Sequence, residues 1–529
     1  MGKRTIVTIL ETSDLHGHVF PYLYGTMQEA PVGLSRVSTI VKRVRQENEN
    51  VLLVDNGDLI QGTPMTYHTI RSLHEERNPM VLLLNELAYD AAVIGNHEFN
   101  YGIEPLHQAV NESQFPWLSA NLLGEESSRP VFGSPYVVKE TKDGVRVAIL
   151  GVTTHYIPNW ENPLHIQGIE FQDAYEATKQ WVAWLRDNEN PDVVIVSYHG
   201  GFESDLQSGE PTETHTGENQ GYKLCMEMAG IDVLLTGHQH RLLAKSDVNG
   251  VAIVQPGNNG RAVGQVEITL EDVDGTWKIV QKKSSLLSTA DEVPDEELLQ
   301  KVNHYEQQTQ IWLDKQIGEV QGDMIISHPL AARIREHPFV EFIQRVQMDA
   351  ANTDVSNTAL FTNEPAGLPK KVTMRDIVSN YVYPNTLTVL RLTGKQIREA
   401  LERSATYFQV SENGDIEVNP SFCEPKPQHY NYDMWEGIEY EMDVSLPEGN
   451  RVVKLEKNGV PLQLDDQVDV VMNNYRAGGG GDYTMFKGAT IVREVQIDMA
   501  EILANYFEKH PVVIAKCNDN FRVVCSKKD

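Results

Sequence analysis

Five short apolar segments of the chain are each followed, within a few residues, by a side chain that can bind a metal ion. They span residues 6–10, 51–54, 91–94, 193–196 and 231–235 and are rich in Val, Ile and Leu. Their length and composition are typical of buried strands. In an open α/β sheet, ligands bind beyond the carboxyl ends of such strands. The sequence therefore predicts an α/β fold with a site where five chain segments meet at one rim.

The side chains that follow these strands form a mixed oxygen and nitrogen ligand set without a thiolate. Such a set favours borderline divalent ions (Mn²⁺, Zn²⁺, Fe²⁺ or Co²⁺) over a Cys-rich zinc site or an all-oxygen calcium site. One ion cannot use so many ligands, so we expect two ions about 3.5–4 Å apart, bridged by a carboxylate that is best supplied by Asp58. The candidate ligands are Asp14, His16, Asp58, Asn96, His199, His238 and His240.

Each motif is weak alone, because an Asp-x-His or a lone histidine after a strand is commonly structural. Their order, D-x-H, G-D, G-N-H-E, H and G-H-x-H, resembles that of the calcineurin-like metallophosphoesterase superfamily across residues 5–242. The resemblance implies a four-layer αββα domain. It also implies that His97 acts on the leaving oxygen, with Asn100 beside it where related enzymes carry Asp. It assigns Asp14, His16, Asp58 and His240 to one ion, and Asp58, Asn96, His199 and His238 to the other.

The pattern of the chain changes after Gly257, where alternating residues predict antiparallel strands that close the first domain. Pro294 and the surrounding acidic residues then predict the start of a helix that runs to about Ile317. We expect a catalytic domain at 1–290, a linker helix at 291–318 and a smaller α/β substrate-binding domain at 319–529.

The second half contains aromatic and glycine-rich segments. A run of four glycines at 478–481 lets backbone approach a planar ligand, or forms a mobile loop. With the preceding Asn-Asn-Tyr-Arg-Ala, it resembles the 5′-nucleotidase/UDP-sugar hydrolase/2′,3′-cyclic phosphodiesterase family. The resemblance implies that Tyr383 and Tyr475 stack on the nucleobase, with Tyr381 and Tyr432 as alternatives for the first ring. Asn385 is expected at the base edge and Asp482 at the ribose.

Three features favour the 2′,3′-cyclic-nucleotide 2′-phosphodiesterase/3′-nucleotidase branch of that family. Asn100 replaces the usual Asp, a Gly-Gly-Gly-Ile-Arg segment has no counterpart near 359–365, and the sequences around Tyr383 and Tyr475 match that branch. A 5′-nucleotidase or UDP-sugar hydrolase is the alternative. A non-catalytic binding module on the same fold is a distant one, since it predicts lost ligands, whereas every ligand position is filled.

Charge and composition limit the partners and the location. The net charge of −30 argues against nucleic acid polymers, so small-molecule nucleotides are the expected substrates. We also expect a monomer or weak dimer. No apolar run reaches the roughly 18 residues of a membrane span. Because the first strand follows the initial Met closely, we expect no secretory leader before Asp14. Four scattered cysteines are typical of reduced thiols, which together with these features predicts a cytoplasmic protein.

Overall fold

The computed structural model describes residues 3–25, 27–73, 76–159, 161–212, 215–381, 383, 385–424, 426–495 and 497–526. The chain forms two compact units. The first contains residues 1–158 and 163–309, and the second contains 159–162 and 310–529. No helix in the described part of the chain combines the length and the apolar character needed to cross a membrane.

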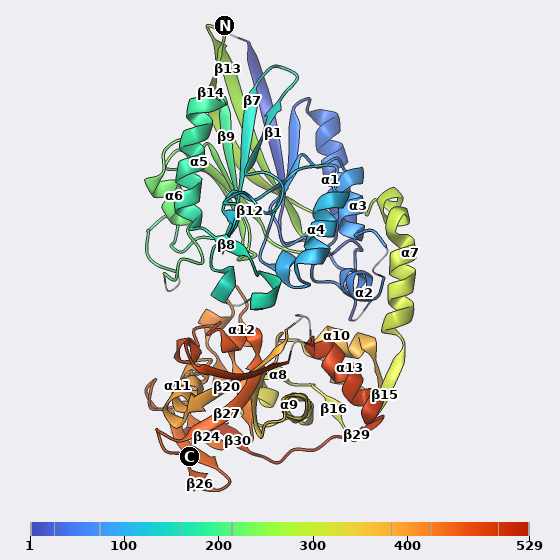
Figure 1. The fold of residues 1–529 in the computed structure, drawn as a ribbon, viewed down its shortest axis with the longest axis vertical. Helices are drawn as coiled ribbons and strands as arrows, with labels where there is room; N and C mark the ends of the chain where they lie inside the picture. The colour runs from blue at the N-terminus through green and yellow to red at the C-terminus, as the bar shows by residue number, and fades with distance from the viewer. Residues whose placement is uncertain are drawn as a thin grey trace. The chain divides into compact units, whose positions relative to one another are not determined.

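Two six-stranded sheets form the centre of the first unit (Figure 1). One has the order β14 (Thr276–Ser288), β13 (Ala262–Val273), β1 (Arg4–Thr12), β2 (Val51–Asp55), β3 (Ala91–Val93), β4 (Trp117–Leu118). The other has the order β11 (Leu242–Val248), β12 (Val251–Pro256), β10 (Val233–Thr236), β9 (Val193–His199), β7 (Arg146–Thr153), β6 (Tyr136–Glu140).

The sheets pack face to face, and helices cover their outer faces. Apolar side chains from both sheets, such as Ile9, Val54, Ile195 and Leu235, share one buried core. The outer face of the second sheet packs on a separate core that includes Tyr175 and other residues of α5 (Ala174–Asn188) and α6 (Gly221–Glu227). Figure 1 shows α1 (Leu34–Glu47), α3 (Pro79–Glu86) and α4 (Ile103–Glu112) on the opposite side. The predicted four-layer αββα arrangement is confirmed.

All five predicted ligand-bearing strands are present, but they are divided between the two sheets. Strands β1, β2 and β3 are parallel neighbours in the first sheet, and β7, β9 and β10 are parallel neighbours in the second. Their carboxyl ends therefore present loops from both sheets to one site. The predicted antiparallel strands after Gly257 are β13 and β14, which form a long hairpin.

The predicted linker helix is shorter than expected. Helix α7 covers Glu296–Leu313, and β15 (Gln316–Gln321) begins three residues later. The helix does not reach Ile317 because this segment pairs instead with β19 (Lys371–Thr373) and β29 (Val512–Ile514). Backbone hydrogen bonds to these two strands take the place of a further helical turn.

The second unit is built on a five-stranded sheet with the order β23 (Asp433–Glu436), β17 (Val355–Ala359), β27 (Gln467–Asn473), β20 (Leu387–Thr393), β28 (Thr490–Val495). A four-stranded sheet contains β26 (Val460–Pro461), β25 (Val452–Lys457), β24 (Glu439–Asp443) and β30 (Phe521–Val524). The helices include α8 (Pro329–Ile334), α9 (Pro338–Ala351), α10 (Met374–Asn380), α11 (Gly394–Ala405), α12 (Asn474–Ala477) and α13 (Met499–Lys509). One apolar core joins these elements.

Candidate dimetal and nucleotide sites

The loops that carry the ligands hold an uncommon backbone conformation. Five of the seven candidate ligands have positive φ angles: Asp14 (53°), His16 (47°), Asp58 (57°), His238 (64°) and His240 (57°). A non-glycine residue in this region costs about 1–3 kcal/mol, and such residues cluster at functional sites because the surrounding structure must hold them there. The strain is concentrated at the carboxyl ends of β1, β2 and β10.

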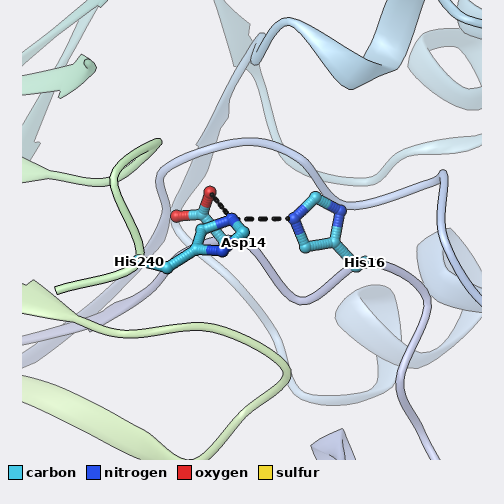
Figure 2. Close-up of side chains that lie close together, drawn as sticks. All are labelled: Asp14, His16 and His240. Atoms are coloured by element: carbon cyan, nitrogen blue, oxygen red, sulfur yellow. Dashed lines mark hydrogen bonds and ion pairs between the residues drawn. The ribbon is translucent and has the colours of Figure 1, made fainter. Parts of the chain in front are cut away.

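The first ligand group contains Asp14, His16 and His240 (Figure 2). The Nε2 atoms of His16 and His240 lie 3.2 Å apart, and His240 Nε2 lies 3.3 Å from Asp14 Oδ1. Two nitrogen ligands about 2.0–2.1 Å from one ion are separated by about 3–3.4 Å at ordinary coordination angles. The three side chains therefore have the spacing of groups that share one ion.

The second ligand group contains Asp58, His199 and His238. His199 Nε2 lies 3.3 Å from Asp58 Oδ2 and 3.0 Å from Asn96 Oδ1. The same amide oxygen lies 2.9 Å from His238 Nδ1. Asn96 therefore joins this group as a fourth side chain with an oxygen facing the same point.

Asp58 lies between the two groups. Its Oδ2 atom is 3.3 Å from His199 Nε2 in the second group and 4.0 Å from His16 Nε2 in the first. Its other oxygen, Oδ1, accepts a hydrogen bond of 2.8 Å from the backbone N–H of His97. The side chain is 1% exposed. A buried carboxylate held in this way is suited to bridging two cations.

Three of the imidazole rings are each oriented by a hydrogen-bonding contact of the ring nitrogen that faces away from the ligand group. His16 Nδ1 faces the carbonyl oxygen of Gln61 at 3.2 Å, and His199 Nδ1 faces that of Asn56 at 2.7 Å. An Nδ1–H that donates to a carbonyl leaves Nε2 as the lone-pair donor, which is the usual arrangement in metal sites. In His238 the two nitrogens exchange these roles: Nδ1 faces the ligand group, and Nε2 lies 2.8 Å from Glu218 Oε1.

The pKa shifts in the two groups favour the ligand forms of His16 and Asp58. Burial lowers the pKa of His16 to about 3, so its ring is neutral and can act as a ligand at neutral pH. Burial alone would raise the pKa of Asp58, but the neighbouring His199 and His97 rings hold it well below its ordinary value. Burial would lower the pKa of His199, but Asp58 raises it to about 10. A bound cation can replace the proton that this pair otherwise holds.

Glu98 connects the loops of the site through backbone hydrogen bonds. Its carboxylate is fully buried and accepts from the N–H groups of Asp58, Leu59, Ile60 and Gly95 at 2.6–3.2 Å. This side chain thereby fixes the loop after β2 to the loop after β3. The sequence placed Glu98 in a motif but gave it no role.

His97 lies beside the ligand groups and belongs to neither of them. Its ring centroid is 5.3 Å from that of His16, and its Nδ1 atom lies 2.6 Å from Asn100 Oδ1. Asn100 thus lies at the orienting position beside His97 where related enzymes are expected to carry Asp. The short 3₁₀ turn at His97–Phe99 brings the two side chains together.

Aromatic rings gather in the second unit around the predicted stacking pair. Tyr430 contacts both Tyr383 and Tyr475, with ring centroids 6.5 Å and 6.4 Å apart and edge-to-face geometry. All three rings are partly exposed. The alternative platforms Tyr381 and Tyr432 are 5% and 0% exposed and belong to the apolar core, which argues against a stacking role for them.

The tetraglycine segment holds the Tyr475 ring. A Cβ atom at Gly480 would lie 2.5 Å from that ring, and the Gly480 carbonyl accepts a hydrogen bond from Arg476. Arg476 is buried and pairs with Asp433 at 2.8 Å. The glycines therefore allow close packing within the protein, which neither the mobile-loop nor the ligand-approach hypothesis anticipated.

The other two predicted substrate residues have different surroundings. Asp482 is exposed, and its carboxylate pairs with Arg403 at 3.2 Å. The backbone of Asn385 donates to the carbonyl oxygen of Tyr383 and accepts from Met499. Asn385 thus joins the segment after α10 to the start of α13, close in sequence to Tyr383.

Comparison with known proteins identifies both halves of the chain. Residues 7–242 match the family model of calcineurin-like phosphoesterases, and residues 316–488 match that of the 5′-nucleotidase C-terminal domain. A 2′,3′-cyclic-nucleotide 2′-phosphodiesterase/3′-nucleotidase of Salmonella typhimurium is 30% identical over 89% of this chain and 81% of its own length. The chain belongs to the 5′-nucleotidase family.

A solved structure has the same two-domain fold. The crystal structure of a candidate 5′-nucleotidase from Staphylococcus aureus has a TM-score of 0.89 and 34% identity, and the match covers 98% of this chain and all of that one. A trifunctional nucleotide phosphoesterase of Bacillus subtilis is 27% identical over 98% of this chain, which spans 39% of that longer protein.

Membership of the 5′-nucleotidase family, with its calcineurin-like phosphoesterase domain, implies a dimetal centre, and the residues present fit one. The structure brings all seven predicted ligands together in the two groups described above. Sequence reasoning missed Glu218 and Tyr430 as contacting residues. Glu218 lies in an irregular loop without a motif, whereas the aromatic stretch that begins at Tyr430 was a usable signal.

Proposed function

We propose that this protein is a dimetal-dependent hydrolase of nucleotide phosphate esters that acts as a 2′,3′-cyclic-nucleotide 2′-phosphodiesterase/3′-nucleotidase. The observation that carries the proposal is the convergence of two ligand groups on Asp58, with His97 beside them but outside both. The Salmonella typhimurium relative bears this name, as do relatives from Yersinia enterocolitica and Haemophilus influenzae.

The ligand atoms support Mn²⁺, Zn²⁺, Fe²⁺ or Co²⁺ as the bound ions. When bound, two such ions supply Lewis-acid activation of water and neutralise charge on the phosphoryl group. The protein contributes a carboxylate between the two groups and rings that neighbouring carbonyl oxygens hold in a ligand tautomer. Proposed roles are Asp14, His16, Asp58 and His240 at one ion, and Asp58, Asn96, His199 and His238 at the other.

His97 is the proposed group that exchanges a proton with the leaving ribose oxygen. Asn100 Oδ1 faces Nδ1 at 2.6 Å and acts as acceptor for its N–H, and we propose Nε2 as the atom that exchanges the proton. In a cyclic substrate the leaving oxygen is the ribose 2′ oxygen, and the product is a 3′-nucleotide. A second hydrolysis at the same site would release phosphate.

The second unit supports a nucleoside as the part of the substrate that is recognised. Tyr383, Tyr430 and Tyr475 offer partly exposed rings of the kind that stack on bases. We propose small-molecule nucleotides as the substrates, and we expect no nucleic acid polymer because the net charge of −30 opposes one.

A 5′-nucleotidase or UDP-sugar hydrolase is the second candidate function. It is favoured by the Staphylococcus aureus candidate 5′-nucleotidase, which is 34% identical and matches over nearly the whole chain. Against it stands Asn100, because a carboxylate is expected there in 5′-nucleotidases. A purely binding role finds no support, since both ligand groups are complete.

Parallel assays with four substrates test the proposal. The purified, Mn²⁺-loaded protein is given 2′,3′-cyclic AMP, 3′-AMP, 5′-AMP and UDP-glucose, and phosphate or nucleotide release is measured. We expect the first two to be hydrolysed with the highest kcat/KM. A strong preference for 5′-AMP or UDP-glucose would transfer the assignment to the second candidate. An inactive protein with two bound ions would refute both.

A further inference from the structure

A second cluster of potential metal ligands lies in the C-terminal unit. One ligand atom each from Glu336, Glu341 and Cys517 lies within 4.8 Å of the other two. Glu336 is in the loop between α8 and α9, Glu341 is in the first turn of α9, and Cys517 follows β29. Glu436, the last residue of β23, lies beside Glu336 and raises its pKa. Segments far apart in the sequence thus bring three carboxylates and a thiol together.

Two carboxylates of this cluster are buried and that of Glu336 is partly buried, and all three are incompletely hydrogen-bonded. Glu341 is 3% exposed and Glu436 is 6% exposed. Within the described residues, one buried oxygen of each carboxylate has no hydrogen-bond partner: Oε1 of Glu336, Oε2 of Glu341 and Oε2 of Glu436. A buried, unpaired carboxylate is costly, so such a group needs a cation or a proton.

The remaining oxygens of the same side chains are fixed in place. Glu336 Oε2 accepts from the backbone N–H groups of Asn518 and Asp519 at 2.8 and 2.6 Å. Glu436 Oε1 accepts from Asn518 Nδ2 at 2.8 Å. Each of these carboxylates therefore has one oxygen anchored and one available. Hydrogen bonds to one oxygen thus orient each carboxylate so that the other oxygen can bind a cation.

Neighbouring basic residues do not pair with every carboxylate oxygen of the cluster. Arg345 Nε lies 3.1 Å from Glu341 Oε1, and Lys516 Nζ lies 3.9 Å from the same oxygen. Both cations therefore face Oε1 and leave Oε2 unpaired. Burial, with the neighbouring carboxylates, raises the pKa of Glu336 to about 8 and that of the Cys517 thiol to about 12. Both groups are thereby favoured in their protonated forms, so a cation that binds here must displace those protons.

We propose that Glu336, Glu341 and Cys517 bind a divalent cation, with Glu436 as a further oxygen donor, at a site separate from the dimetal centre. A thiolate together with carboxylates favours borderline ions such as Zn²⁺ or Co²⁺ over Ca²⁺ or Mg²⁺. Cys517 is exposed, so an ion can enter from solvent. The bound ion would tie the segment that leads into β30 to the start of α9. This proposal does not depend on the proposed function.

Cobalt binding to the full-length protein distinguishes this site from the dimetal centre. Neither ligand group in the first unit contains a cysteine, so thiolate-to-cobalt charge-transfer absorption reports only on a cysteine-bound ion. The metal-free protein is titrated with Co²⁺ while bound cobalt and the absorption are measured. We expect the protein to bind three equivalents of cobalt, two at the dimetal centre and one at the new site. The absorption band should grow in proportion to the occupancy of the new site alone.

Cysteine variants assign the band. Cys517→Ser should abolish it and remove one equivalent, while Cys423→Ser, at a partly buried cysteine outside the cluster, should leave both unchanged. Asp58→Asn should reduce the cobalt bound at the dimetal centre without altering the band. A wild-type protein without the band, or a band that survives in Cys517→Ser, would overturn the proposal.

Two glutamate variants test whether the carboxylates of the cluster bind a cation or only share a proton. Glu341→Gln should weaken binding of the thiolate-bound cobalt at least about tenfold, as expected for loss of a charged ligand. Glu402→Gln is the matched control, because Glu402 is a partly buried glutamate whose oxygens already accept from Arg451 and Val452. Equal cobalt affinity in both variants and the wild type would show that the cluster holds only a proton.

Discussion

Asp58 is the single side chain shared by the two catalytic ligand groups. Replacing it by Asn keeps the shape and removes the charge between His16 and His199. We expect Asp58→Asn to bind fewer than two Mn²⁺ ions in the first unit and to lose activity, because a neutral amide cannot bridge two cations well. Metal analysis after gel filtration checks this. Wild-type metal content with wild-type activity would contradict the bridging role.

His97 should be important for turnover and dispensable for metal binding. We expect His97→Asn to lower kcat by roughly 10²–10⁴, the range of general acid–base groups, with metal content unchanged. The loss should be smaller with a p-nitrophenyl ester, whose leaving group needs little protonation. Loss of metal in this variant would instead identify His97 as a ligand.

Tyr475 should contribute to affinity for substrates that carry a base. We expect Tyr475→Ala to raise KM for 2′,3′-cyclic AMP by about one to two powers of ten, which corresponds to one lost stacking face. Hydrolysis of bis-p-nitrophenyl phosphate, which has no base, is the control and should barely change. Equal losses on both substrates would show that the ring supports the fold.

The sequence was most informative where a function depends on neighbouring residues. Asp14 with His16, and His238 with His240, form short motifs after strands, and the structure places them together. Glu218 was missed because it reaches His238 from a loop 20 residues away that has no periodicity. Tyr430 was passed over because its contacts with Tyr383 and Tyr475 depend on how three separate segments pack.

Among the elements, strands were predicted better than helix ends. Strands β1, β2, β3, β9 and β10 each contain a run of mostly apolar residues, because the facing sheet and the outer helices bury most of both strand faces. The end of α7 was misplaced because pairing of β15 with β19 and β29, and not local propensity, ends the helix. Such pairing involves residues distant in sequence, which periodicity cannot reveal.

The buried pair of Arg476 and Asp433 joins α12 to β23. Arg476 is 1% exposed and Asp433 is 2% exposed, with Nε and Oδ2 2.8 Å apart. We expect Asp433→Asn to destabilise the second unit by about 3–5 kcal/mol, because it leaves a buried guanidinium uncompensated. Asp469→Asn, which breaks an exposed pair with Arg391, should cost at most about 1 kcal/mol. Urea unfolding measures both, and equal costs would show that the buried pair is not structurally important.

The whole molecule divides into two compact units, and the dimetal ligands lie in the first. Ions that bind only the folded state should stabilise that unit by about 2.7 kcal/mol per site at a free concentration 100 times the Kd. In calorimetry with Mn²⁺ we therefore expect Asp58→Asn to lower the unfolding temperature of one transition, and Asp433→Asn to lower that of the other. A single transition that both variants shift equally would show that the units unfold together.

The predicted monomeric or weakly dimeric state and the predicted cytoplasmic location stay predictions. The location was inferred from the cysteine content and the start of the chain, and the fold itself leaves both predictions open. The fold class, by contrast, followed from the five apolar segments and their polar ends, because burial of parallel strands leaves a strong local signature.

The left-handed backbone of five ligands affects how substitutions at this site are interpreted. Asn and Asp adopt that conformation more readily than Ala, so an alanine at Asp14 or Asp58 removes a ligand and also strains the loop. Alanine scanning would therefore overstate the contribution of ligation at these positions, and asparagine is the more informative replacement. Grafting the site onto another scaffold would likewise require the loop geometry to be transplanted with the side chains.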